Sequence, residues 1–301
     1  MPATETVRWF RLLHRALGVI LLMAMGIPKG GGNLDLVRYH PDASGWSVYD
    51  LVATLEQQAG MPQGDTLTLI SCVYAALCAA LLAGWHVRAI AIALLLAHYH
   101  IYVAVPLYSY GFDYIALSAL TYCAAYSQRW GAITLRALQL HLCIIYLFGG
   151  LNKLVGPAWR NGEALWKAVQ QSYGQPLISL SGVEALPWLW LAAGWGVVLL
   201  ELSYPFLIWW RRARPWVLGS MVLLHLAIAL LMGLYAFSAL MILLNLVAYH
   251  FPYSKDYVNP PTAPPEQSPA HTGIQKNIID QTPACNTSST SPAGAVVKKP
   301  P

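Results

Sequence analysis

A lysine that follows two glycines stands at the end of one apolar run and has the chemistry of an acid or a base. Lys153 comes shortly after Gly149 and Gly150 in the stretch Tyr146–Trp166, YLFGGLNKLVGPAWRNGEALW. Glycines let a second backbone or a flat ligand come close to such a lysine. A lysine costs a few kcal/mol at the centre of a bilayer and much less at its interface, where it can snorkel. The stretch therefore fits an interfacial anchor or a lysine that contacts a ligand.

Four further ionisable side chains occur inside apolar runs, where an uncompensated charge is costly. They are His98, His141, Glu201 and His225. At 1.5 Å per residue, all four lie roughly 12–16 Å from the inner ends of their predicted helices. We expect Glu201 to pair with His225, because their helices follow one another through a short turn. This polar layer could fix helix packing, carry protons or bind a haem or metal, but the histidine spacing favours no particular metal site.

Long apolar runs must position these residues. The sequence is 57% hydrophobic and 10% charged, and a ~30 Å hydrocarbon layer requires runs of roughly 18–25 apolar residues in a helix. We predict an all-α, polytopic membrane bundle of about eight transmembrane helices, although two short runs leave six or seven possible. Their ranges are about 9–27, 67–84, 87–105, 112–126, 133–153, 186–210, 216–233 and 237–251.

Basic residues are concentrated in alternate connections between these helices, which predicts the orientation in the membrane. One side carries most of them: Arg8, Arg11, Arg15, Arg88, Arg129, Arg136, Arg211, Arg212, Arg214 and Lys255. We therefore expect both termini to be cytoplasmic and the protein to lie in the cell membrane. The net charge of +5 then reflects topology, and the predicted surroundings are a lipid bilayer and not nucleic acid.

The chain divides by composition into two parts. Residues 1–253 are expected to form the transmembrane domain, and residues 254–301 are rich in Pro, Ser and Thr. The second part is too poor in apolar residues to fold, so we predict a disordered cytoplasmic tail. Two long outer connections, 28–66 and 156–187, are possible lids over Lys153. Within them, Ser47–Gln58 and Gly162–Ser172 are predicted interfacial helices.

Two blocks of sequence resemble the vitamin K-dependent gamma-carboxylase-like family, which is built on the HTTM (horizontally transferred transmembrane) domain. The blocks are YLFGGLNKL at Tyr146–Leu154 with Trp159 and Gly162, and LLELS at Leu199–Ser203 with His225 and Tyr235–Phe237. The resemblance implies that Lys153 is a base that deprotonates a hydroquinone. It also makes neighbouring residues of the first block candidate substrate contacts: Tyr146, Gly149, Gly150, Asn152 and Trp159.

The sequence also departs from the carboxylase pattern. In the carboxylases a His stands five residues before an Asp at the entry to the fourth helix. Here Asp113 matches the Asp, and Tyr108 takes the place of the His. Both positions are therefore further candidates for substrate binding. The carboxylases continue into a large lumenal domain, whereas this chain continues into the predicted tail, so we do not expect peptide carboxylation.

Three classes of function fit these observations. The first is a membrane enzyme that acts on a quinone or another lipid-soluble redox molecule, with Lys153 as general base. The second is a transporter or channel that uses the polar layer as its path. The third is a non-catalytic membrane subunit that binds a protein partner through its outer loops. The sequence leaves open which of these applies, and thus whether the protein is an enzyme.

Overall fold

The computed structural model describes residues 3–26, 54, 57–60, 65–103, 110–170, 176–178 and 186–250. These residues all belong to one compact unit, Met1–Pro260. Within them every regular element is a helix, which confirms the all-α prediction. The predicted tail, Tyr108 and the first predicted interfacial helix, apart from three of its residues, lie outside the described residues.

The helices follow the predicted apolar runs closely. The first four runs correspond to α1 (Ala3–Gly26), α4 (Asp65–Ala83), α5 (Val87–His98) with the π-helix η1 (Tyr99–Val103), and α6 (Gly111–Ala125). The last four correspond to α7 (Gly131–Val155), α10 (Pro187–Leu207), α11 (Arg214–Met232), and α12 (Tyr235–Asn245) with the π-helix η2 (Leu246–His250). Between α7 and α10 lie the short helices α8 (Pro157–Arg160) and α9 (Glu163–Gln170), and α9 matches most of the second predicted interfacial helix.

Three of these helices, α7, α10 and α11, are long and apolar enough to cross a membrane. The apolar segments Thr68–Ala83, Val87–Ile101 and Tyr235–His250 are shorter. A span of ~30 Å of hydrocarbon requires about 20 residues in a helix, so the shorter segments do not by length alone establish a crossing. The number of eight transmembrane helices stays a prediction.

Proline and glycine set several helix ends. Pro157, Pro187 and Pro215 stand in the first turns of α8, α10 and α11, where the missing N–H has no helical partner to lose. Gly233 ends α11 at a φ of 71°, a left-handed conformation that glycine adopts without a Cβ clash. These residues divide the apolar sequence into separate helices, and so define the connections of the bundle.

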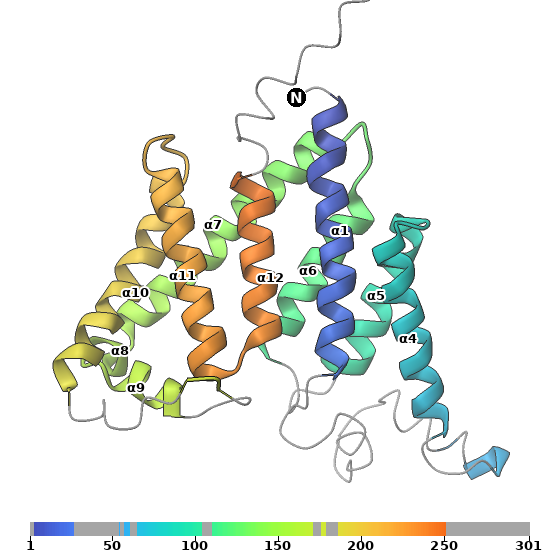
Figure 1. The fold of residues 1–301 in the computed structure, drawn as a ribbon, viewed down its shortest axis with the longest axis horizontal. Coiled ribbons are helices and arrows are strands. Elements are labelled where there is room, and N and C mark those ends of the chain that lie inside the picture. The colour runs from blue at the N-terminus through green and yellow to red at the C-terminus, as the bar shows by residue number, and fades with distance from the viewer. Residues whose placement is uncertain are drawn as a thin grey trace, which may run out of the picture. The chain divides into compact units, whose positions relative to one another are not determined.

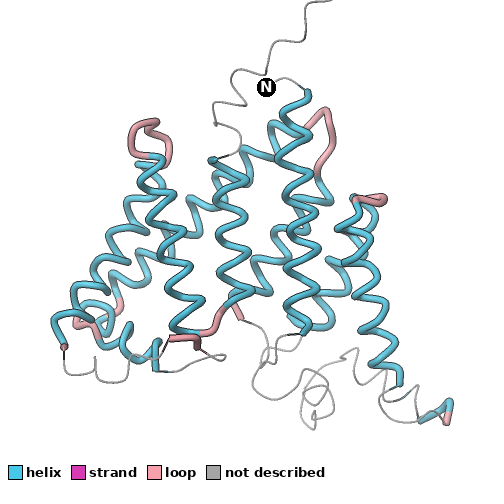
Figure 2. Tube along the Cα trace, in the orientation of Figure 1, coloured by secondary structure: helices cyan, strands magenta, loops and turns pink. Residues whose placement is uncertain are grey.

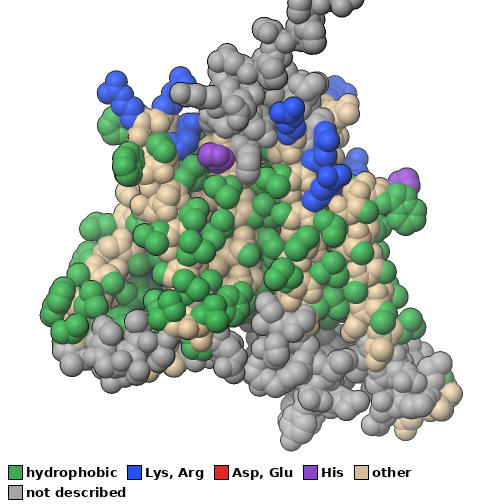
Figure 3. All heavy atoms as spheres, in the orientation of Figure 1, with side chains coloured by type: hydrophobic (Ala, Val, Ile, Leu, Met, Phe, Trp, Pro, Cys, Tyr) green, Lys and Arg blue, Asp and Glu red, His purple; other side chains and the backbone are tan. Residues whose placement is uncertain are grey.

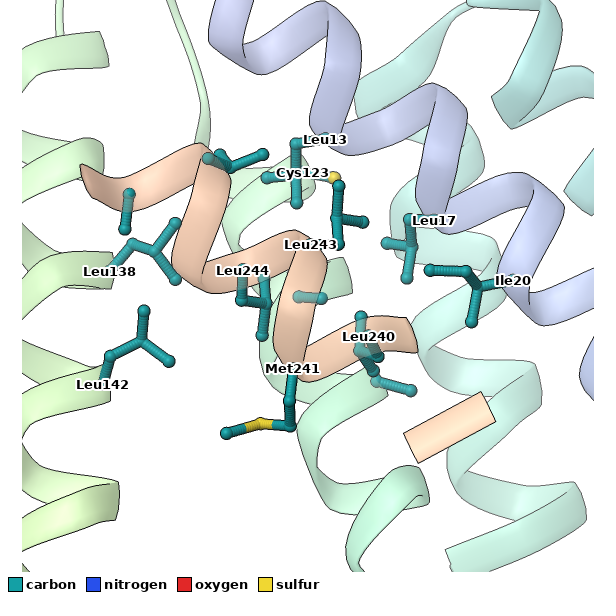
Figure 4. Close-up of a cluster of buried hydrophobic side chains, with 14 of the residues drawn as sticks. Leu13, Leu17, Ile20, Cys123, Leu138, Leu142, Leu240, Met241, Leu243 and Leu244 are labelled. Carbon is teal, nitrogen blue, oxygen red and sulfur yellow. The ribbon is translucent and has the colours of Figure 1, made fainter. Parts of the chain in front are cut away.

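The helix α12 lies between two groups of helices within this unit (Figures 1 and 2). It packs against α11 on one side and against α1 and α6 on the other. On the α11 side, α7 packs along α10, and on the α1 side, α4 and α5 complete the bundle. The close-up of the core shows Leu240 and Leu244 of α12 among Leu138 of α7 and Leu17 of α1 (Figure 4). The interior is therefore organised around the last helix.

The described surface is unusually apolar. Large side chains remain exposed on several helices, including Phe206 and Trp216, the latter at 79%. Figure 3 shows hydrophobic side chains over the middle of the visible face, with Lys and Arg gathered at the end that carries the N-terminus. A helix that is apolar on all sides suits lipid and not water. This distribution is the one expected of helices embedded in a bilayer.

Candidate functional site

Lys153 and Glu201 form an ion pair between α7 and α10. The Lys153 Nζ donates a hydrogen bond of 2.6 Å to Glu201 Oε2. The lysine side chain is 22% exposed and the glutamate side chain 11%. A charge-assisted bond of this length is stronger than a neutral one. The sequence predicted His225 as the partner of Glu201, whereas the hydrogen bond of Glu201 goes to Lys153 on α7, and His225 lies against Tyr146.

The inclination of α7 explains this pairing. Figure 1 shows α7 running obliquely beside the more upright α10 and α11. Its 25 residues span roughly 36 Å at 1.5 Å per residue. A tilted helix crosses a smaller depth of the bundle than its own length. Lys153, near the end of α7, therefore reaches Glu201 in the interior of α10. The lysine is consequently held by a carboxylate, although the sequence also fitted a free interfacial anchor.

Two glycines allow the close approach of α7 and α10. A Cβ on Gly150 would lie 2.9 Å from Leu202 Cγ and 3.0 Å from the Leu202 backbone nitrogen. A Cβ on Gly149 would lie 3.3 Å from Glu201 Oε2 and 3.6 Å from Lys153 Nζ. Small residues at such positions let two membrane helices pack backbone to backbone. Gly150 thus sets the contact between the helices, and Gly149 lets the ion pair lie directly against the backbone of α7.

Trp159 completes the surroundings of Lys153. The lysine Nζ lies 5.3 Å from the centre of the Trp159 ring, a cation–π distance. The short helix that carries Trp159 is fixed against α10, where a Cβ on Gly194 would lie 3.2 Å from the Trp159 carbonyl oxygen. Asn152, by contrast, has an exposed side chain, and its carbonyl accepts the N–H of Gly156 at the end of α7. Of the predicted contacts, Trp159 therefore faces the lysine and Asn152 terminates a helix.

Tyr146 is the centre of a second polar group, two turns before Lys153 on α7. The Asn245 Nδ2 donates to the Tyr146 hydroxyl at 2.7 Å, and this hydroxyl lies 3.0 Å from His225 Nε2. The Tyr204 hydroxyl donates to Asn245 Oδ1 at 2.8 Å. All four side chains are buried. This Tyr146 network joins α7, α10, α11 and the end of α12.

The hydrogen bonds around Tyr146 fit a tautomer of His225 that is protonated on Nδ1. Because Asn245 donates to Tyr146, the single hydroxyl proton of Tyr146 is free to be donated to His225 Nε2. A neutral His225 then carries its proton on Nδ1, which is buried and has no hydrogen-bond partner among the described residues. A buried polar atom without a partner is costly, so it marks a position where a ligand oxygen would be stabilised.

The polar side chains Gln139, Cys143 and Tyr146 form a stripe on α7 that continues toward the N-terminal end of the helix. The Gln139 Nε2 donates to the Ala248 carbonyl at 2.7 Å, and Arg136 donates to Gln139 Oε1 at 2.9 Å. The Tyr249 hydroxyl donates to the Gln139 carbonyl at 2.8 Å and lies 3.3 Å from Cys143 Sγ. The Ala248 carbonyl and the Tyr249 hydroxyl both belong to η2. Single π-helical turns of this kind are often found at functional positions. The stripe is therefore occupied by interhelical hydrogen bonds.

His98 and Asp113 belong to a separate buried cluster. The Tyr74 hydroxyl lies 2.7 Å from His98 Nδ1, and Asp113 Oδ1 lies 3.5 Å from His98 Nε2. Asp113 also accepts the backbone N–H of Tyr110 at 2.9 Å, which caps the start of α6. A cavity of about 10 Å³, the size of one water molecule, adjoins these side chains. The described contacts make Asp113 a helix-capping and histidine-binding residue.

The predicted polar layer is thus divided among several partners. His141 forms its own pair with Tyr122, whose hydroxyl lies 3.0 Å from His141 Nδ1. His98 bonds to Tyr74, and Glu201 bonds to Lys153, so the three side chains have different partners. In the described part of the chain, no three His, Cys, Asp or Glu side chains converge as metal ligands would. The residues missed by the sequence reasoning are Asn245, Tyr204 and Tyr74, and only the polar Asn245 in an apolar run gave a signal.

The family comparison matches the part of the chain that holds this site. The model of the HTTM domain matches residues 112–252. The chain carries an HTTM domain. That domain extends from α6 to η2 and includes both the Lys153–Glu201 pair and the Tyr146 network, whereas Tyr74 and His98 precede it. No curated protein and no solved structure matches the chain. With its apolar helices, the HTTM domain makes this a membrane protein.

Proposed function

We propose that the HTTM domain is a membrane enzyme that takes a proton from a lipid-soluble hydroquinone, with Lys153 as the general base. The observation that carries the proposal is the partly buried 2.6 Å bond between Lys153 and Glu201. A lysine that only anchors a helix would extend its ammonium group to water and would not need a carboxylate on the next helix. The resemblance to the carboxylases supports the same role for Lys153.

The ion pair accounts for how a charged lysine becomes a base. Glu201 accepts the proton of the Lys153 ammonium along their shared hydrogen bond, which leaves the amine lone pair free. The amine then takes the proton of a substrate hydroxyl. At the end the proton lost by the substrate is on Lys153, the former lysine proton is on Glu201, and the substrate is an anion beside an ammonium group. An oriented cation in a partly desolvated site stabilises such an anion strongly.

The surroundings of the pair fit a flat aromatic alcohol. The Gly149 backbone lies directly beside Lys153 and Glu201, and Trp159 provides an aromatic face to the same lysine. The unpartnered Nδ1 of His225 offers a further polar contact inside the domain. A bound hydroquinone would supply the acidic hydroxyl and, as its anion, a reductant for dioxygen. The residues that would hold it are Lys153, Trp159 and, through its ring nitrogen, His225.

The distribution of basic residues supports an orientation in which Lys153 belongs to the outer half of the domain. Lys and Arg gather at the end of the described unit that carries the N-terminus (Figure 3). Under the positive-inside rule that end is cytoplasmic. The proposed enzyme therefore lies in the cell membrane with both termini inside. The alternative of a transport path along the polar layer has less support, because those side chains bond to different partners.

Oxygen uptake by proteoliposomes containing a reduced long-chain naphthoquinone tests the proposal. Dioxygen oxidises a hydroquinone anion much faster than the neutral form, so uptake reports deprotonation. Lys153→Arg should keep the ion pair and the fold but abolish protein-dependent uptake, because guanidinium does not release its proton. Lys153→Ala should also be inactive.

The chain provides a matched control in a second lysine–glutamate pair. Lys167 and Glu163 are also 2.6 Å apart, but their side chains are 60% and 47% exposed. Lys167→Arg should leave uptake unchanged. If Lys153→Arg proteoliposomes consume oxygen at the wild-type rate, Lys153 is not the base and the proposal is wrong.

A further inference from the structure

A separate pocket lies where the connection between α8 and α9 meets the start of α10. Its volume is about 300 Å³. The lining residues are Asn161, Gly162, Glu163, Trp166, Pro187 and Trp190. A pocket of this size is at the lower end of small-molecule sites. It can hold a small organic group, and nothing in the proposed proton transfer uses it.

Two tryptophans form a corner in this pocket. The rings of Trp166 and Trp190 are 5.1 Å apart, and their planes meet at 64°. Trp190 is buried on α10, and Trp166 is half-buried on α9. At this distance the two rings contact each other edge to face, and both residues line the pocket. The π-face of a tryptophan attracts organic cations.

A backbone feature holds this corner in place. Gly162 has a φ of 83°, and a Cβ there would lie 2.7 Å from the backbone nitrogen of Leu191. The chain therefore passes directly against α10 just before α9 begins, which any other residue would prevent. This contact fixes Trp166 of α9 relative to Trp190 of α10. The pocket is thus built by the fold and does not depend on a flexible surface side chain alone.

A carboxylate stands at the edge of the pocket. The Glu163 Oε1 is bound by Lys167 at 2.6 Å, while Oε2 has only a long contact of 3.4 Å with Asn161 Nδ2. Hydrogen bonds from Lys167 and Asn161 hold the pKa of Glu163 below its usual range, so the group is charged at neutral pH. The less strongly held oxygen lies on the side of Asn161, which lines the pocket. A cation in the pocket beside the tryptophans would therefore also meet a negative charge.

We propose that this pocket binds a quaternary ammonium group, the choline headgroup of a phospholipid. A trimethylammonium group has no N–H, so it needs no hydrogen-bond acceptors beyond a negative surface, whereas a primary ammonium would need acceptors that this pocket supplies poorly. Leu189 and Leu191 next to the pocket on α10 are exposed, and they provide an apolar surface for the acyl chains. The lipid is recognised by its headgroup and held beside the bundle by its chains.

The test uses the full chain reconstituted in liposomes with equal amounts of phosphatidylcholine, phosphatidylethanolamine and phosphatidylglycerol. After extraction in detergent, native mass spectrometry counts the lipids that stay bound. The wild-type chain should retain phosphatidylcholine preferentially. Trp166→Leu, which removes one π-face but remains apolar, should lower that preference about fivefold, the equivalent of one cation–π contact.

Trp188→Leu is the matched control, because Trp188 is an exposed tryptophan of the same helix start and does not line the pocket. It should retain the wild-type preference. Equal retention of the three lipids by the wild-type chain, or equal behaviour of the two leucine variants, would overturn the proposal. The melting temperature of Trp166→Leu in detergent reports its folding without reference to oxygen uptake, so failure here is distinguishable from failure of the proton-transfer proposal.

A titration with soluble glycerophosphocholine separates two sources of the same headgroup. Binding of this probe that is lost in Trp166→Leu, together with lipid retention, supports a phospholipid site. Binding of the soluble probe without preferential lipid retention assigns the pocket to soluble quaternary ammonium compounds and overturns the phospholipid assignment.

Discussion

Lys153 and Glu201 are 48 residues apart in the sequence, and one hydrogen bond of 2.6 Å joins them across α7 and α10. The two side chains compensate each other's charge in a partly buried position. An ion pair taken out of water is sensitive to the loss of one partner and much less sensitive to the loss of both. The stability of the domain should therefore depend on the pair as a unit.

This dependence predicts the outcome of a double-mutant cycle. Lys153→Met and Glu201→Gln should each lower the melting temperature in detergent, by the equivalent of about 1–3 kcal/mol, because each leaves a polar group without its partner. The double variant should melt closer to the wild type than the sum of the two single effects predicts. Strictly additive effects would mean that the two side chains do not interact.

The contact of α7 with α10 should be intolerant of a methyl group at Gly150. Gly150→Ala places a Cβ 2.9 Å from Leu202 Cγ and 3.0 Å from its backbone nitrogen, so the helices must separate. Overpacking of this kind costs about 1–3 kcal/mol. Gly196→Ala is the control, because a Cβ there meets nothing within 4 Å. Thermal denaturation should show a clear loss for Gly150→Ala and none for Gly196→Ala, and equal melting temperatures would contradict the close approach.

Loss of a single oxygen atom from the Tyr146 network should lower the stability of the domain. Tyr146→Phe removes the hydroxyl that Asn245 Nδ2 and His225 Nε2 share. Leaving buried polar groups without a partner costs about 1–3 kcal/mol. Tyr114→Phe, at an exposed tyrosine on α6, is the comparison. We expect Tyr146→Phe to melt at a lower temperature than Tyr114→Phe, and the reverse order would exclude a stabilising role for this hydroxyl.

The orientation of the protein in the membrane can be measured by cysteine labelling of intact cells. The background is Cys72→Ala with Cys285→Ala, which removes the exposed thiol among the described residues and the cysteine outside them. On this background, Gln170→Cys at the end of α9 should react with a membrane-impermeant reagent. Gln128→Cys, between α6 and α7, should react only after permeabilisation. Both positions are exposed, so accessibility to the reagent depends on the membrane. The opposite pattern would reverse the predicted topology.

The helix ranges were predictable because hydrophobicity alone determines where a membrane helix runs. The predicted span 216–233, for example, corresponds to α11 at Arg214–Met232. The partner of Glu201 was not predictable in the same way. Depth counted along each helix treats all helices as parallel, and the inclination of α7 alters which residues meet. Inclination is set by packing, which hydrophobicity does not encode.

The polar residues of the site also include some that the sequence could predict and some that it could not. Glu201 and His225 were recognised because ionisable side chains are costly in hydrocarbon. Asn245 and Tyr204 carry no charge, so their part in the Tyr146 network follows only from the helices that bring them together. His98 was recognised, but its contact with Tyr74 depends on how α4 packs against α5. Residue type identified polar candidates, and tertiary packing determined their partners.

The central position of α12 has a consequence for how the chain is assembled during synthesis. This helix is the last one described, yet it packs against α1, the first. Until the ribosome has released residues 235–245, the inner side chains of α1 have no permanent neighbour at that position and must face lipid or an insertion factor. Contacts between distant parts of a chain form slowly because the intervening loop must close. A nascent chain halted after α11 should therefore be recognised by membrane quality control as an unfinished bundle.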